Sequence, residues 1–171
     1  MGGRDTANRQ RFGFEVLTRR LATPADAAAL AAFINDAFLV EAFFKIGDRT
    51  DEADVLEHMR DGEFLVVEDS NGLIGCVYVA ISGDRGYLGM LSVDRSNQRQ
   101  GHGRQLVEWA ESHALARGCR FMDMHIVNLR EELFPYYQAL GYRESGTLPF
   151  DDSGRISRPC HFVVMTKALS A

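Results

Sequence analysis

The segment from Tyr87 to Trp109 constrains the fold of this 171-residue chain more than any other part of it. It starts as an apolar run that predicts a strand, continues as a polar loop containing Gly101 and Gly103, and ends as an amphipathic helix. Because glycine has no side chain, the loop's backbone N–H groups can approach a ligand closely. These groups also lie at a helix N-terminus, which carries partial positive charge, so the segment predicts a phosphate or pyrophosphate site.

Composition limits the partners that such a site can serve. The net charge is −5 and the arginines are scattered, so no extended nucleic-acid surface is expected. No apolar run approaches the roughly 20 residues that cross a bilayer, and no membrane association or signal peptide is expected. Cys76, Cys119 and Cys160 lack the spacing of metal ligands. We interpret them as buried, reduced thiols of a cytoplasmic protein without a metal site.

The chain before the glycine loop predicts two helices followed by antiparallel strands. Residues 1–12 read as a disordered tail, and residues 13–171 as a single domain. Thr23 followed by Pro24 is a typical helix start, and Asn71-Gly72 is typical of a hairpin turn. The predicted elements are a strand at 14–19, helices at 25–39 and 51–60, and strands at 63–69, 73–81 and 87–93.

After the loop, a helix at 104–117 and a strand at 121–127 are expected. A strand–helix–strand connection of this length predicts that strands 87–93 and 121–127 pair in parallel. Asn128 is then expected to cap a helix at 130–140. Strands at 142–145 and 161–167 close the chain, with a polar loop at 151–155 between them. The sequence thus predicts one α+β domain with a mixed sheet.

Three motifs together resemble the GNAT superfamily of acetyl-coenzyme A-dependent N-acyltransferases. Gln98-x-x-Gly101-x-Gly103 matches that family's pyrophosphate loop, and the preceding strand reads Met90-Leu-Ser-Val93, where the family has a bulge. Tyr137-Gln-Ala-Leu-Gly141-Tyr142 is similar to the end of the family's next helix. The resemblance implies an antiparallel N-terminal meander, a parallel strand pair flanking a cofactor cleft, and helices on both sheet faces.

The same resemblance implies that acetyl-CoA is the cosubstrate. The loop amides would bind its pyrophosphate, and backbone groups of the preceding strand would pair with its pantetheine arm. The bulge there could hold the thioester carbonyl. The implied cofactor-binding residues are Leu91, Val93, Gln98, Arg99, Gln100, Gly101, His102, Gly103, Arg104 and Asn128.

The implied reaction is direct acetyl transfer to a primary amine. Tyr137 is the candidate general acid for the departing thiolate, and Tyr136 is its rival because the helix register decides which one faces the cleft. Glu41 is the candidate base, with a solvated loop carboxylate as the alternative interpretation. Other candidates in or near the site are His125, Asp123, His161, Ser92 and Asp94.

The acceptor is expected to be a small-molecule or peptide amine. Phe43, Phe44 and Phe150 with Arg49 predict a pocket that is part aromatic and part basic, which suggests a substrate carrying a carboxylate. A non-catalytic CoA-binding regulatory module of the same fold is the alternative function. The resemblance also leaves open a homodimer formed through the terminal strands.

Overall fold

One seven-stranded sheet organises the part of the chain that this computed structural model describes, residues 16–150 and 154–170. Its strands are β1 (Thr18–Leu21), β2 (Gly62–Asp69), β3 (Gly72–Ser82), β4 (Arg85–Val93), β5 (Phe121–Val127), β6 (Arg143–Pro149) and β7 (His161–Ala168). Their spatial order is β1-β2-β3-β4-β5-β7-β6. Strands β1 to β4 form the predicted antiparallel meander, and β4 pairs with β5 in parallel.

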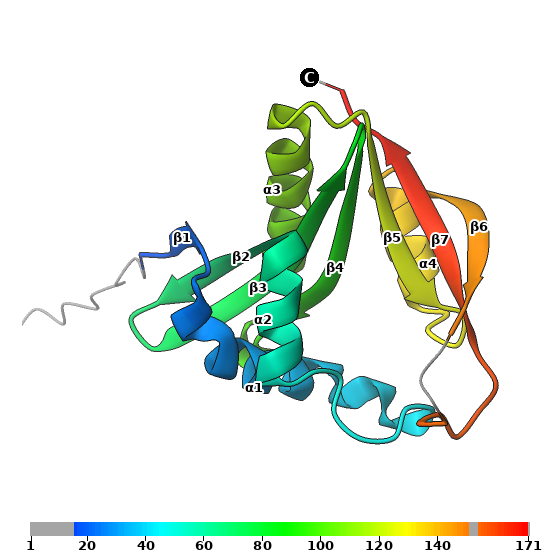
Figure 1. Ribbon diagram of the computed structural model, residues 1–171, viewed down its shortest axis with the longest axis horizontal. Coiled ribbons are helices and arrows are strands. Elements are labelled where there is room, and N and C mark those ends of the chain that lie inside the picture. Colours follow the sequence, from blue (N-terminus) through cyan, green and yellow to red (C-terminus); the bar gives the residue numbers. More distant parts are fainter. Residues whose placement is uncertain (1–15, 151–153, 171) are drawn as a thin grey trace, which may run out of the picture.

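Helices cover both faces of this sheet, as predicted. They are α1 (Ala27–Ala37), α2 (Glu52–Asp61), α3 (His102–Ala116) and α4 (Leu133–Ala139). Figure 1 shows α1 and α2 in front of the sheet and α4 behind it. Side chains alternate between two cores along each strand: Val77 packs with the α3 and α4 side, and its neighbour Tyr78 with the α1 and α2 side. The predicted α+β class is confirmed.

The parallel pair β4–β5 is in register over three residue pairs, from Arg85 opposite Phe121 to Tyr87 opposite Asp123. The Arg85 guanidinium closes this end by binding the Asp123 carboxylate at 2.7 Å through two nitrogens. Beyond it the two strands diverge, as the green β4 and the olive β5 show in Figure 1. The sheet therefore opens as a wedge between β4 and β5.

A bulge in β4 lies at the open part of this wedge. The β3–β4 register shifts between Cys76 and Tyr78, and Met90 there has a φ of 51°, in the left-handed region. The bulge predicted from the family resemblance is therefore present. It changes the direction in which the β4 backbone groups face where β5 has moved away.

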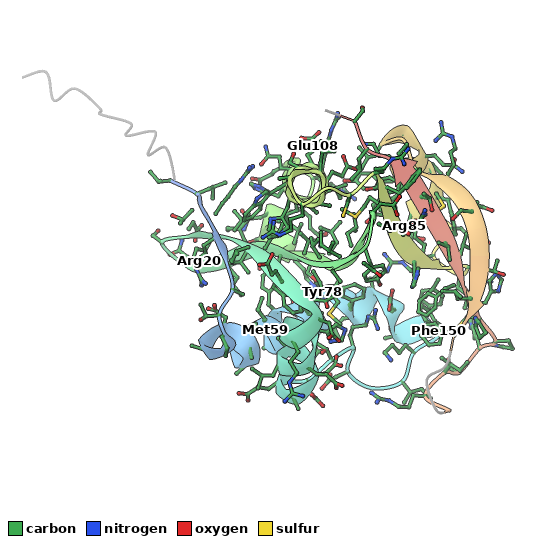
Figure 2. The ribbon with its side chains drawn as sticks, turned by 45° about the horizontal axis from the view of Figure 1, so that its top comes forward. Arg20, Met59, Tyr78, Arg85, Glu108 and Phe150 are labelled. Atoms are coloured by element: carbon green, nitrogen blue, oxygen red, sulfur yellow. The ribbon has the colours of Figure 1, made fainter. Side chains whose placement is uncertain are left out.

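Residues 38–50, here called the crossing segment, span the open end of the wedge and contact the chain before β7 through their middle part. The segment starts as 3₁₀ turns (η2, Phe38–Phe43) and runs to Thr50. The Ile46 amide donates to the Arg155 carbonyl at 2.7 Å, and the Phe44 carbonyl accepts from the Ser157 amide at 2.8 Å. Figure 2 labels Phe150 beside this contact, at the end of β6.

The predicted first helix differs from the structure at both ends. A single helix over 25–39 was expected, but residues Pro24–Asp26 form 3₁₀ turn η1, α1 ends at Ala37, and η2 follows. A 3₁₀ turn has three residues per turn instead of 3.6, and over so few residues the apolar pattern does not distinguish the two geometries. The change of geometry after Ala37 turns the chain away from the sheet and into the crossing segment.

The predicted cap at Asn128 is wrong. Helix α4 begins at Leu133, and Asn128 pairs with the start of β7: its amide donates to the His161 carbonyl at 2.9 Å, and its Oδ1 accepts from the His161 amide at 2.8 Å. The later start of α4 places Pro135 in the first turn, where its missing N–H costs no hydrogen bond. Tyr137 then falls inside the helix.

The remaining predictions concern the chain ends, cysteines and membrane. The predicted tail at 1–12 and the start of the predicted strand at 14–19 lie outside the described residues, and β1 covers Thr18–Leu21. Cys76 and Cys119 are buried as free thiols, whereas Cys160 is only half-buried. Within residues 16–150 and 154–170, the helices are all too short or too polar to cross a membrane.

Candidate active site

A cavity of about 1100 Å³ fills the wedge between β4 and β5. Its walls come from β4, the glycine loop, the start of α3, β5, α4 and the crossing segment. Eight of the ten predicted cofactor residues line it: Leu91, Val93, Gln98, Arg99, Gly101, His102, Gly103 and Arg104. Gln100 and Asn128 are not among its lining residues, and Asn128 is instead bound to the start of β7.

The glycine loop has the geometry of an anion site. Gly101 precedes α3 with a φ of 81°, in the left-handed region, and a side chain there would meet no atom within 4 Å. The first hydrogen bond of the helix runs from the Gln105 amide to the Gly101 carbonyl at 3.1 Å. The amides of residues 102–104 therefore have no acceptor one turn back and are free for a ligand. These free amides at a helix N-terminus form a cradle that suits a phosphate or pyrophosphate group.

Tyr136 belongs to the loop end of the cavity. A Cβ atom on Gly103 would lie 3.6 Å from the Tyr136 hydroxyl oxygen and 3.8 Å from Val93. The Tyr136 side chain is partly exposed, and its ring contacts that of Tyr137 edge-on with centroids 5.0 Å apart. The two adjacent tyrosines thus occupy different places, with Tyr136 beside the loop.

Tyr137 lies deeper, at the boundary of the cavity and the core. It is 7% exposed and packs between the rings of Tyr136 and Tyr142. Among the described residues its hydroxyl has no hydrogen-bond partner, and the side chain lines the cavity. Burial raises the pKa of this phenol well above its usual value, so the group stays protonated at neutral pH.

Glu41 is a buried member of the cavity wall. It is 7% exposed, which rules out the solvated loop carboxylate considered from sequence. Its Oε1 accepts from Nη1 of Arg130 at 3.1 Å, and Arg130 also binds Glu132 at 2.6 Å. Burial raises the pKa of Glu41, although the charges of Arg49, Arg130 and Lys45 act in the opposite direction.

The other candidate bases, His125, Asp123 and His161, differ in their position relative to the cavity. His125 lines the cavity between the rings of Tyr87 and Phe162, at 4.9 and 5.7 Å, and burial lowers the pKa of its imidazole, which favours the neutral form. Asp123 is bound to Arg85 and Thr166 and is not a lining residue. His161 is exposed at the start of β7. Of these three, His125 alone is among the residues that line the cavity.

Ser92 and Asp94 have local structural partners. Ser92 is buried, lines the cavity, and donates from Oγ to the Met90 carbonyl at 3.1 Å across the bulge. Asp94 accepts hydrogen bonds from Ser96 and Asn97 in the turn after β4, and the bond from Ser96 holds the pKa of this carboxyl below its usual range. Asp94 is thus a turn carboxylate.

Arg130 and Tyr87 were missed by sequence reasoning, although both line the cavity. Arg130 follows β5 in a segment without a motif, and Tyr87 reads as an ordinary strand residue. Only the fold brings Arg130 to Glu41, 89 positions away in the chain. No local pattern marks a pair of this kind.

No group of three or more His, Cys, Asp or Glu side chains in the described ranges could hold a metal ion.

Comparison with known families decides the kind of protein. The family model described as "Acetyltransferase (GNAT) family" matches residues 31–142, most of the chain. The chain belongs to this family. The enzyme is thus an N-acetyltransferase, and its family uses acetyl-CoA, for which the free amides of the glycine loop provide a fitting site.

Solved structures share the fold at low sequence identity. Ard1 from Thermoplasma volcanium is 16% identical with a TM-score of 0.74, over 91% of this chain and 99% of that one. The ribosomal-protein-S18-alanine N-acetyltransferase from Escherichia coli is 16% identical with a TM-score of 0.72, over 91% and 96%. The yncA protein from Salmonella typhimurium, solved with its cofactor acetyl-CoA, is 20% identical with a TM-score of 0.68, over 90% and 94%. Among curated proteins, none matches the sequence.

Proposed function

We propose that this enzyme transfers an acetyl group directly from acetyl-CoA to a primary amine, with Tyr137 as general acid and Glu41 as base. One observation carries the proposal: Tyr137 and Glu41 line the same cavity as the glycine loop. Direct transfer requires the donor, an acid and a base around one space, and the cavity provides these groups together.

The donor would be held mainly by backbone groups. The amides of residues 102–104 and the guanidinium groups of Arg99 and Arg104 would bind the pyrophosphate. The β5-facing edge of β4 lies open beyond Tyr87, so backbone groups at Leu91 and Val93 can pair with the pantetheine amides as an added strand would.

Acetyl-CoA supplies a thioester, whose carbonyl carbon the neutral amine attacks. Glu41 would take the proton of the ammonium, directly or through a water molecule, because its raised pKa brings it closer to the range of a useful base. His125 is the second group in the cavity that can accept this proton.

Tyr137 would donate its phenolic proton to the sulfur as the bond from sulfur to the carbonyl carbon breaks, and the proton that the attacking nitrogen loses on becoming an amide would restore the phenol, directly or through water. Its buried phenol stays protonated until that step, because a phenolate would be costly there. Backbone groups of β4 at the bulge around Met90 would bind the carbonyl oxygen as it acquires negative charge.

Substitution of Tyr137 by phenylalanine tests the acid. We expect kcat for thiol release to fall by about 100-fold, with KM for acetyl-CoA changed less than about twofold, because general acid catalysis contributes about 10²–10⁴-fold. Tyr136→Phe is the matched variant and should leave kcat near wild type, since that hydroxyl lies by Gly103. An unchanged kcat in Tyr137→Phe with a reduced kcat in Tyr136→Phe would assign the role of general acid to Tyr136. If the wild-type protein released no thiol with any amine, the alternative function, a non-catalytic CoA-binding module, would remain.

A further inference from the structure

Arg49 stands at the junction of two cavities. It lines the main cavity and also a second one of about 640 Å³, which lies against α2 and the loop before it. Tyr87, Gly89 and Met90 line both as well, so the two spaces meet at β4 beside the bulge. The second cavity lies on the sheet face opposite α3, away from the glycine loop. A molecule approaching the bulge from this side would pass the Arg49 guanidinium.

We propose that the acceptor is a primary amine that also carries a carboxylate, and that Arg49 binds this carboxylate. The proposal rests on the acetyl transfer proposed above and specifies the second substrate of the same site.

The first observation that carries it is an unpaired donor. Nε of Arg49 is the one buried side-chain nitrogen or oxygen in the described ranges that lacks a hydrogen-bond partner. Buried donors are normally paired, so an unpaired one at a cavity points to a ligand. The Nε–H and a neighbouring Nη–H of a guanidinium form a planar pair of donors, which matches the two oxygens of a carboxylate.

The second observation is that Arg49 is held in place. Asn35 on α1 makes two hydrogen bonds to the backbone of Thr50, accepting from its amide and donating to its carbonyl, each at 2.9 Å. The Arg49 guanidinium also lies over the Phe38 ring, 5.3 Å from its centroid. The backbone next to Arg49 is thus anchored and its guanidinium rests on one ring, so the side chain loses less freedom when it binds, which favours a binding role.

The third observation is the charge of the surroundings. Arg130 pairs with both Glu41 and Glu132, whereas Arg49 acts on the Glu41 carboxylate but forms no ion pair with a carboxylate of the described residues. Of the three acidic residues that line the outer cavity, Asp51 caps α2 by accepting from the Asp54 amide, the Asp54 carboxylate accepts from Thr50, and Asp48 precedes Arg49 in the chain. A ligand carboxylate would neutralise the positive charge of the Arg49 guanidinium.

The amine of such an acceptor has its own partners across the cavity. Glu41 can accept its proton, and the rings of Tyr87 and Phe162 on either side of His125 offer apolar walls for the carbon skeleton. The site would thus recognise an amino acid by both of its charged groups, with an aromatic or aliphatic side chain between the rings.

The test compares matched pairs of amines that differ only in the carboxylate. Thiol release from acetyl-CoA is measured with L-phenylalanine against phenethylamine and with L-leucine against 3-methylbutylamine. For the wild-type enzyme we expect kcat/KM to be about 10- to 100-fold higher for the carboxylate-bearing member, as for a hydrogen-bonded charge pair. Arg49→Gln should remove this preference, so that the two members of each pair react with similar kcat/KM, and Arg49→Lys should keep part of it.

Arg158→Gln serves as the charge-matched control, because Arg158 lies over the Phe43 ring and lines neither cavity. Thermal stabilisation of each variant by acetyl-CoA verifies that it folds and binds the donor. Equal wild-type rates within every pair, or a preference that survives Arg49→Gln, would overturn the carboxylate site and leave acetyl transfer intact. Stabilisation by acetyl-CoA without thiol release from any amine would overturn the transfer itself, and the acceptor with it.

Discussion

At the scale of single residues, burial gives Glu41 and Tyr137 complementary properties. It raises the pKa of both groups because each charged form is poorly solvated inside the wedge. For the phenol this secures the protonated form that an acid needs, and for the carboxylate it strengthens a base. The sequence marked Tyr137 through its distance from Gly141, but burial of Glu41 depends on Arg130, which no motif connected to it.

Asp26 allows a test of pH-dependent stability at this scale. Arg20 donates to both of its oxygens, and this bond lowers the pKa of Asp26 from 3.8 to about 2. A lowered pKa means that the stabilisation is complete above the unfolded value and is lost as the pH falls through about 2. We expect Asp26→Asn to lower the free energy of unfolding by about 1–2 kcal/mol at pH 7, with the difference vanishing near pH 2.

Urea denaturation from pH 7 to pH 2 measures this effect. The control is Asp36→Asn, because Asp36 is 58% exposed and pairs with Arg95 at 3.5 Å, an arrangement that contributes little to stability. A pH-independent difference in Asp26→Asn would show that Asp26 acts only as a hydrogen-bonded cap in the turn before α1.

At the scale of elements, the loop and α3 form a unit that local sequence specifies well. Two glycines, an apolar strand before them and an amphipathic helix after them require no distant contact to form an anion site. For this reason the predicted bounds of the loop and of strand β5 lie within two residues of the observed bounds. Helix α4 was harder, because Asn128 fits a cap as well as it fits the strand partner that it becomes.

Gly101→Ala tests this element. The residue has a φ of 81°, which costs a residue with a side chain about 1–2 kcal/mol, and any relaxation would move the amides that we propose bind the pyrophosphate. We expect the variant to lose about 1 kcal/mol of stability and to raise KM for acetyl-CoA by about tenfold.

Gly83→Ala is the matched control, because Gly83 also has a positive φ, 59°, with open space around it, and lies in the β3–β4 turn outside the cavity. It should show a similar loss of stability in urea and an unchanged KM. If the two variants changed KM alike, the loop would not be the site of pyrophosphate binding.

At the scale of the whole molecule, the wedge is stabilised across its open end by the crossing segment. The segment contacts the chain before β7 through backbone hydrogen bonds and contacts the region after β5 through the Glu41–Arg130 pair. Both side chains of that pair are nearly inaccessible, at 9% and 12% exposure. Loss of Arg130 would leave the Glu41 carboxylate buried without its hydrogen-bonded ion-pair partner.

Arg130→Met should therefore lower the free energy of unfolding by about 3 kcal/mol at pH 7. The loss should shrink as the pH falls, because Glu41, with its pKa raised further, then takes up a proton in the folded state. The double variant Glu41→Gln/Arg130→Met should recover most of the stability, since neither charge remains. Urea denaturation of the wild type, of Glu41→Gln, of Arg130→Met and of the double variant gives the coupling energy between the two side chains. Additive losses of stability would mean that the pair does not stabilise the wedge.

The sequence by itself determined the order of the elements, the α+β class and the donor loop, because periodicity, turn residues and glycine positions act over short distances in the chain. Tertiary structure alone decided how β4 and β5 diverge, that Glu41 is buried against Arg130, and that Arg49 is left with an unpaired donor between two cavities. The Glu41–Arg130 pair joins residues 89 positions apart, and the other two features depend on how separate elements pack, so none of the three leaves a local pattern in the sequence. The glycine loop therefore marks the proposed donor site, and the packing of the crossing segment shapes the part of the cavity where we propose that the acceptor binds.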